Sequence, residues 1–384
     1  MKKALVLSGG GGRGAYHVGV IRALVERGWM CDGQGPDIIA GTSIGAVNAS
    51  AIASGMTVAD LEYHWRQMHS EDVHRLSSDL PAISRPLMRF ILRSILTSKS
   101  GGGEQQIKDE LPESERNLDS MGLFNRLRGI FHTTPFRSLL DTAPWRQTLS
   151  RWIDFGRINS LAAPTLLLTA TDVRRGTLKV FCNHQPNGTV RDTLTLDHIM
   201  ASSSIPAIYP WTTVADDFYW DGAVLANTPL GPIIEYAGGD VDIIVVMMTP
   251  WEADPDDLDD QLEDMPKDLA QALWLTLDWA LLASYRASFK LLKLYNRIAD
   301  AAQKLKQAAS QTGDESLRWE GRMPHRVAEP LVIAPQHLMP LDWIVDYEDD
   351  NHERLFTMGY NDALAALDKR ENDAMLRDLL RQGS

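Results

Sequence analysis

The sequence predicts an α/β fold with a mainly parallel central sheet, helices on both faces of it and a C-terminal helical extension. Short apolar segments alternate with segments of helical periodicity near the N-terminus. Strands are expected at residues 4–8 and 37–40, and helices at 15–27 and 46–54. Strands that alternate with helices in this way pair in parallel, because each helix carries the chain back across one face of the sheet.

The later elements continue this pattern with longer helices. Further strands are expected at residues 165–171, 178–182, 242–248 and 331–334, of which 178–182 is an edge strand. Helical regions are expected at residues 60–97, 268–309 and 353–380, the last one interrupted at Gly359. Residues 98–120 combine a glycine tract with many acidic side chains and are expected to be a flexible insertion, and the acidic run 252–264 a solvated loop.

The composition excludes several classes of protein. Acidic residues outnumber basic ones, 51 to 38, and the net charge of −13 argues against nucleic acid as a partner, because phosphate binding needs a cationic surface. Only Cys31 and Cys182 are present, so no disulfide framework is expected and a reducing, cytoplasmic location is favoured. Since no apolar segment is long enough to cross a bilayer, the expected membrane contact is peripheral, at the inner surface.

The first motif is a run of glycines between the first strand and the first helix: Gly9, Gly10, Gly11, Gly12, Arg13 and Gly14. Glycines let the backbone turn tightly and point its N–H groups outward, and the helix that follows adds its positive end. Such a loop can hold a phosphate or a developing oxyanion. A dinucleotide site also needs an acidic residue at the end of the second strand, where this chain has Ala40, Gly41 and Thr42.

The second motif follows the second strand directly and has the pattern G-x-S-x-G, with Gly41, Ser43 and Gly45 at its fixed positions. A strand before it and a helix of small residues after it are the context of a nucleophile elbow, in which a strained turn exposes the serine hydroxyl. An ordinary Gly/Ser turn is the plain alternative. In an α/β-hydrolase several strands precede the elbow, whereas here one strand–helix unit does, so that topology fits poorly.

The third motif is Asp-Gly-Ala, beginning with Asp221 and Gly222. Asp-Gly alone is a common turn. Together, however, GGGGRG, GTSIG and DGA resemble the patatin-like phospholipases, which carry these three motifs in this order. The surrounding runs TATDVRRG and ASSSIPAIYP fit as well, and the resemblance covers residues 4–232.

The resemblance implies a catalytic domain at residues 4–232 that residues 233–384 complete. It implies a Ser–Asp dyad, in which Ser43 is the nucleophile and Asp221 the general base. The implied oxyanion donors are the backbone N–H groups of Gly10, Gly11 and Gly12. The implied activity is lipid acyl hydrolysis of the phospholipase A or lysophospholipase type, through an acyl-enzyme. A general carboxylesterase or thioesterase on the same dyad is the alternative, and a non-catalytic lipid- or nucleotide-binding module a more distant one.

Other side chains leave alternatives open. Arg13 stands at the family's basic position and pairs either with lipid phosphate or with a carboxylate. His17 and His198 are rival bases for Ser43, although a helix-borne histidine is more often packed or solvated. No His–Cys spacing suggests zinc, and the acidic run lacks the pattern of a calcium loop, so no metal or cofactor is expected.

Two segments are candidates for contact with a membrane that holds the lipid substrate. In residues 85–96, Arg85, Arg89 and Arg93 share one helical face and apolar side chains occupy the others. In residues 269–294, several aromatic side chains are followed by two lysines. For residues 85–96, packing against the rest of the protein explains the pattern at least as well as membrane contact does. For residues 269–294, packing inside the protein is the expectation.

Overall fold

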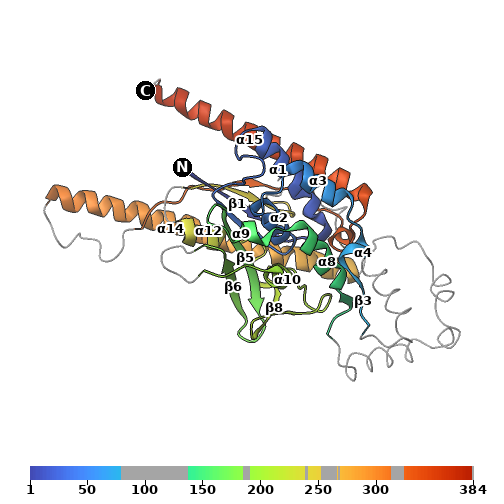
Figure 1. Cartoon of the computed structure of the whole chain (residues 1–384). Coiled ribbons are helices and arrows are strands. Elements are labelled where there is room, and N and C mark those ends of the chain that lie inside the picture. Colours follow the sequence, from blue (N-terminus) through green and yellow to red (C-terminus); the bar gives the residue numbers. More distant parts are fainter. Residues whose placement is uncertain are drawn as a thin grey trace.

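An eight-stranded sheet lies between layers of helices and carries the three motifs (Figure 1). The computed structural model describes residues 1–78, 137–184, 191–237, 241–251, 266, 269–312 and 324–382. Within these residues the strand order is β10-β9-β1-β2-β5-β8-β7, with β6 also paired to β5. The strands of this sheet are β1 (Lys2–Leu7), β2 (Ile38–Thr42), β5 (Thr165–Asp172), β6 (Thr177–Cys182), β7 (Thr212–Val214), β8 (Asp217–Asp221), β9 (Val241–Val246) and β10 (Leu331–Ile333).

One half of the sheet is parallel and the other half antiparallel. The parallel half pairs β10 with β9, β9 with β1, β1 with β2 and β2 with β5. Beyond β5, both β6 and β8 run antiparallel to it, and β7 pairs with β8 as a hairpin. The predicted mainly parallel sheet is therefore confirmed, but the β7–β8 hairpin was not expected from the sequence. A second, two-stranded sheet joins β3 (Arg75–Leu76) to β4 (Leu140–Asp141).

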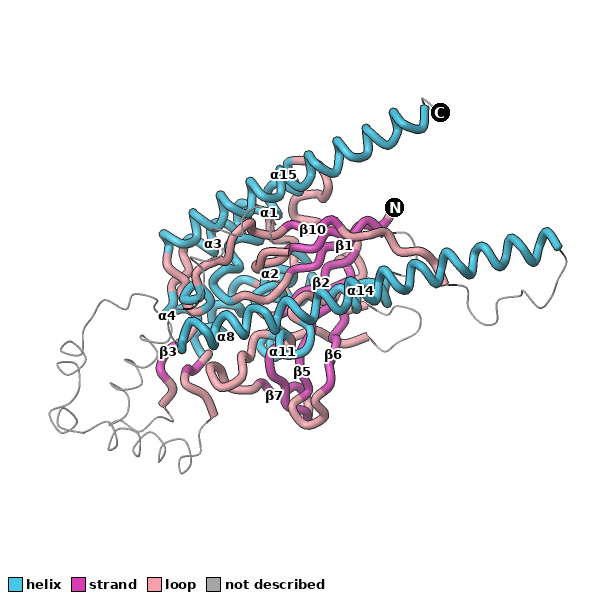
Figure 2. Tube along the Cα trace, turned by 180° about the vertical axis from the view of Figure 1, so that it is seen from behind, coloured by secondary structure: helices cyan, strands magenta, loops and turns pink. Residues whose placement is uncertain are grey.

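Helices cover both faces of the large sheet, as Figures 1 and 2 show. Alternate side chains of β1 enter different hydrophobic clusters: Leu5 and Leu7 join one, Ala4 and Val6 the other. The first cluster includes α1 (Ala15–Glu26), α2 (Ile44–Ala53), α3 (Val58–Arg66), α8 (Ala143–Trp152), α10 (Leu196–Ser202) and α15 (Asp349–Gln382). The second includes α12 (Leu230–Ala237) and α14 (Leu269–Thr312). The shorter elements are η1 (Gly11–Gly14), α4 (Ser70–Val73), α9 (Phe155–Ile158), α11 (Ala223–Ala226) and η5 (Leu341–Ile344).

Helices α1 and α15 pack closely because each has a glycine at the contact. A Cβ at Gly19 would lie 2.0 Å from the carbonyl oxygen of Phe356, and a Cβ at Gly359 would lie 2.1 Å from that of Tyr16. The prediction that Gly359 interrupts the last helix is therefore wrong, since α15 runs through it without a break. The glycine serves the approach of two helices there, not a break in one of them.

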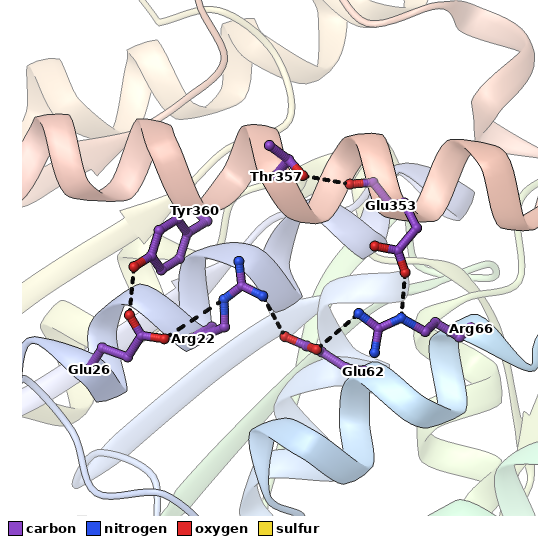
Figure 3. A network of polar contacts seen from close by, with 7 residues as sticks. All are labelled: Arg22, Glu26, Glu62, Arg66, Glu353, Thr357 and Tyr360. Atoms are coloured by element: carbon purple, nitrogen blue, oxygen red, sulfur yellow. Dashed lines mark hydrogen bonds and ion pairs between the residues drawn. The ribbon is translucent and has the colours of Figure 1, made fainter.

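Surface ion pairs and hydrogen bonds link α1, α3 and α15 across this contact (Figure 3). Glu62 lies between two guanidinium groups, 3.1 Å from Arg22 and 3.2 Å from Arg66. Arg66 also pairs with Glu353 of α15, and the Tyr360 hydroxyl lies over α1 and donates to Glu26. Exposed pairs of this kind contribute about 0–1 kcal/mol each, so the glycine contact matters more for the position of α15.

Several sequence expectations lie outside the described residues, namely those for 85–96, 98–120 and 252–264. The sequence predicted helical structure over residues 60–97. Helices α3 and α4 confirm this for 60–66 and 70–73, whereas Arg75–Leu76 form the strand β3, so the prediction is wrong there. Cys31 and Cys182 are both free. Among the helices that the structure describes, none combines the length and apolar character needed to cross a membrane.

Candidate active site

Ser43 occupies a strained turn between β2 and α2. Its backbone has φ 57° and ψ −127°, a conformation that a residue with a side chain rarely adopts. The turn is tight on both sides: a Cβ at Gly41 would lie 2.3 Å from the Gly45 carbonyl oxygen, and a Cβ at Gly45 would lie 2.2 Å from that of Leu7. Only glycines fit there, which is the physical reason for the two fixed glycines of a nucleophile elbow.

Neighbouring hydroxyl groups hold this turn in place. The Ser43 backbone N–H donates to the Ser202 hydroxyl, 3.0 Å away, at the end of α10. The Thr42 hydroxyl lies 2.6 Å from that of Thr169 on β5 and donates to the Ala226 carbonyl at 2.9 Å. In the sequence, the run ASSSIP counted only as part of a family resemblance. In the structure, its Ser202 supports the backbone of Ser43.

Asp221 ends β8, the strand that pairs antiparallel with β5. Its backbone N–H donates to the Ser204 carbonyl at 2.8 Å, and its own carbonyl accepts from the Thr171 hydroxyl at 2.9 Å. These bonds fix the end of the strand. The carboxylate oxygen Oδ1 accepts from the Ala223 N–H at 2.8 Å, whereas Oδ2 is buried and has no full hydrogen bond among the described residues.

The Asp221 carboxylate interacts with the Ser43 side chain in a site closed to solvent. The two residues are 2% and 3% exposed. Burial raises the pKa of Asp221 to about 7, because the charged form is poorly solvated there, while the nearby Ser43 side chain and the hydrogen bond from the Ala223 N–H oppose this rise. The structure therefore brings together the serine and the aspartate that the sequence singled out. The carboxyl group titrates near neutral pH, where a general base works best.

The glycine loop lies beside Ser43. A Cβ at Gly9 would lie 3.0 Å from the Ser43 Cβ, so the two segments are in contact. The Gly9 N–H donates to the Asn227 carbonyl at 3.1 Å, which ties the loop to the segment that follows Asp221. Gly11 has φ +59°, and Gly11–Gly14 form the short helix η1 that leads into α1. The contacts of Gly9 therefore hold the start of the glycine loop against the Ser43 turn.

A segment near the C-terminus packs directly on the glycine loop. We call residues 339–347 the C-terminal strap. A Cβ at Gly11 would lie 1.8 Å from the Ile344 carbonyl oxygen, and a Cβ at Gly12 would lie 2.1 Å from that of Asp346. Two of the three expected oxyanion glycines therefore lack side chains for a reason that the local sequence does not show: the strap occupies the space.

Arg13 connects the glycine loop to the same strap. The side chain is 2% exposed, and its guanidinium donates to the carbonyls of Met339 at 3.2 Å and Pro340 at 3.4 Å. A buried guanidinium with backbone partners favours a structural role over the lipid-phosphate contact that the sequence left open. The hydrogen bonds of Arg13 to the strap therefore explain why the glycine motif carries a basic residue at this position.

Two buried tyrosines near Asp221 were not singled out in the sequence. Tyr209 and Tyr347 hydrogen-bond to each other, and burial together with the nearby Asp221 charge raises the pKa of both. The Tyr209 hydroxyl also lies 3.0 Å from Nδ1 of His74, whose pKa burial lowers to about 4. Tyr347 belongs to the strap and stacks near Trp65. No local pattern marks these residues, because they meet from distant parts of the chain.

The rival histidines lie elsewhere. Nδ1 of His17 is 3.3 Å from the Asn48 side-chain nitrogen, and burial lowers the pKa of His17 to about 3. Nδ1 of His198 accepts from the Thr195 backbone N–H at 3.0 Å, and burial lowers its pKa as well. The described contacts of the two rings include neither member of the Ser43–Asp221 pair.

Three comparisons show which known proteins the chain is similar to. Three solved structures are similar to the chain. VipD from Legionella pneumophila has 14% identity and a TM-score of 0.39, and the type III effector ExoU has 15% identity and a TM-score of 0.36. The SpcU–ExoU complex from Pseudomonas aeruginosa has 18% identity and a TM-score of 0.27. They match 96%, 96% and 81% of this chain, which spans 67%, 53% and 61% of theirs. No curated protein matches. A family model for patatin-like phospholipases matches residues 5–234. Because this match spans more than half of the sequence, the chain belongs to the patatin-like phospholipase family of lipid hydrolases.

Proposed function

We propose that the protein hydrolyses carboxylic esters of phospholipids or lysophospholipids through a Ser43–Asp221 dyad. The observation that carries this proposal is the buried Asp221 carboxyl group, which interacts with the Ser43 side chain and has a pKa of about 7. At neutral pH a large fraction of this carboxylate is ionised and can accept a proton. The family membership supports a lipid substrate.

The reaction begins when Asp221 accepts the Ser43 hydroxyl proton while Oγ attacks the ester carbonyl carbon. The resulting tetrahedral oxyanion is stabilised by backbone N–H groups of Gly10, Gly11 and Gly12, each worth about 3–4 kcal/mol by comparison with other hydrolases. When the intermediate collapses, the C–O bond to the leaving alcohol breaks and the alcohol takes the proton from Asp221. A water molecule then hydrolyses the acyl-Ser43 ester by the same two steps.

The same machinery would also serve a general carboxylesterase or thioesterase. Acyl-chain length separates these activities, because a lipase needs long chains presented at an interface and an esterase does not. We expect higher turnover of phospholipid and lysophospholipid than of short-chain p-nitrophenyl esters or acyl thioesters. The reverse order would favour the esterase or thioesterase.

A fluorophosphonate probe tests the nucleophile directly. We expect it to label wild-type protein on Ser43, and Ser43→Ala to lose both the label and ester turnover while the melting temperature stays near that of wild type. Ser150→Ala in α8 is the matched control, because its exposed hydroxyl bonds only to its own helix at Gln147. Labelling at another site, or more than a few per cent residual turnover in Ser43→Ala, would contradict the proposal.

A further inference from the structure

Helix α14 exposes a continuous apolar stripe. Leu291, Leu294 and Ile298 are 65%, 53% and 43% exposed. Leu305, seven residues after Ile298, is 38% exposed. The spacings of three, four and seven residues place all four on one face of the helix. Exposed single leucines are ordinary, but a stripe of large apolar side chains along one helix indicates a binding surface.

The opposite side of α14 accounts for its packing on the protein. Leu282, Tyr285 and Leu292 are buried in the cluster beneath the sheet, and Tyr285 packs edge-on against Trp251. The expectation that the aromatic residues of 269–294 pack internally is confirmed at Tyr285, which is buried, and at Phe289, which is partly buried. It is wrong at Trp279, which is 43% exposed. The exposed stripe is therefore a second face of α14, one end of which extends beyond the sheet in Figure 2.

A row of cations runs beside the stripe. Lys290, Lys293, Arg297 and Lys304 have the same spacing as the apolar residues, and each one directly precedes a member of the stripe. Adjacent residues of a helix lie about 100° apart, so the two rows run side by side. All four cations are exposed, as are Arg286 and Lys306, and between those two residues Asp300 is the only acid. This cationic surface belongs to a protein whose net charge is −13.

From this arrangement we infer that residues 286–306 of α14 dock on an anionic phospholipid surface. The apolar stripe enters the boundary between headgroups and acyl chains, and the cations beside it contact lipid phosphates. Nucleic acid would use the cations but leave the stripe in water. A second copy could cover the stripe with its own, but this would bring two rows of cations close to each other. The choice of a membrane as the anionic surface rests on the proposed function, because a phospholipid substrate resides in a membrane.

Vesicle co-sedimentation tests the docking without any turnover when it is carried out in the Ser43→Ala variant. The vesicles are pure phosphatidylcholine, or phosphatidylcholine with phosphatidylserine as the anionic lipid. We expect binding to the anionic vesicles that weakens as salt is added, because the charges are screened. Replacing Lys290, Lys293 and Arg297 by Gln should weaken this binding on the order of a hundredfold at low salt, at roughly fivefold for each cation.

Two further variants make the test specific. Leu291→Gln with Ile298→Gln should also reduce vesicle binding, including at high salt, because apolar insertion is lost. A triple change of Lys2, Lys179 and Lys369 to Gln removes the same charge from exposed positions outside α14 and should leave binding close to that of the parent. Every variant is compared with its parent by thermal melting, so that loss of binding is separated from loss of the fold.

The outcomes separate this inference from the proposed function. Equal binding by the parent and the α14 variants, or an equal loss in the control triple variant, would overturn the docking face whether or not Ser43 is catalytic. A concentration-dependent dimer that the Leu291/Ile298 variant abolishes would assign the stripe to a second copy instead. Vesicle binding that depends on α14 in a protein without ester turnover would uphold this inference and refute the proposed hydrolysis.

Discussion

Asp221→Asn should make the protein more stable at pH 8 and nearly inactive at the same time. An amide cannot accept the Ser43 proton, so turnover should fall to a small fraction of wild type. The amide oxygen can still accept from the Ala223 N–H, which is 2.8 Å from the present carboxylate. The substitution therefore removes a buried charge and keeps the hydrogen bond that holds the side chain.

The size of the stability gain follows from the pKa. Burial raises the pKa of Asp221 from 3.8 to about 7, and three units correspond to about 4 kcal/mol that the folded protein spends to ionise this group. Between these two pH values the folded state keeps a proton that the unfolded state has released. The free energy of unfolding of wild type should consequently fall as pH rises from about 4 to about 7 through this group. Above pH 7 the full cost applies, and Asn avoids it.

Urea unfolding of wild type and Asp221→Asn at pH 4.5 and pH 8 measures this difference. The two proteins should differ little at pH 4.5, and the variant should be more stable at pH 8 by up to about 4 kcal/mol. In parallel, kcat/KM of wild type on a soluble ester should rise with pH to a plateau above about 7. A variant that is less stable than wild type at pH 8, or a rate that is flat from pH 5 to 8, would refute a buried carboxyl group that titrates near neutrality.

Four further substitutions test the glycine loop, the rival histidines and the tyrosine pair. Gly11→Ala places a methyl group 1.8 Å from the Ile344 carbonyl at a positive φ, so kcat on a soluble ester should fall about tenfold or more with a smaller effect on KM; a change confined to KM would mean that the loop contacts ground-state substrate. His17→Ala and His198→Ala should each keep substantial turnover where melting shows a folded protein, and complete inactivity of a folded variant would require a triad. Tyr347→Phe removes a hydroxyl that is bonded to Tyr209 and should lower the free energy of unfolding in urea by about 1 kcal/mol; an unchanged value would show that this bond contributes nothing.

The sequence was sufficient for the parts of the fold and site that depend on local geometry. The glycine pattern around Ser43 predicted the strained turn because the turn itself forbids a Cβ on either side. The alternation of apolar strands and helices predicted the parallel half of the sheet. Asp221 became recognisable only through its agreement with the other two motifs, since an Asp-Gly pair has many ordinary uses.

The features that sequence reasoning missed depend on contacts between distant segments. Gly359 looked like a helix breaker, but its role is set by Tyr16 on another helix. The β7–β8 hairpin is short, and of its buried strand residues only Tyr219 is hydrophobic, so its apolar pattern is weak. Tyr347 carries no motif, and nothing near it in the sequence shows that it lies beside Asp221.

The C-terminal strap also sets an order of events during synthesis. Arg13 and its partner Met339 are 326 residues apart in the sequence, and the strap lies well outside the matched family region, which ends at residue 234. A ribosome adds about 5–20 residues each second, so the nucleophile elbow and the aspartate leave the tunnel many seconds before the segment that packs on the glycine loop. The loop reaches its final packing only after the strap, more than 300 residues further along the chain, has emerged. Until the strap is made, the backbone that packs on Gly11 and Gly12 is missing, so the glycine loop cannot yet have the conformation described above.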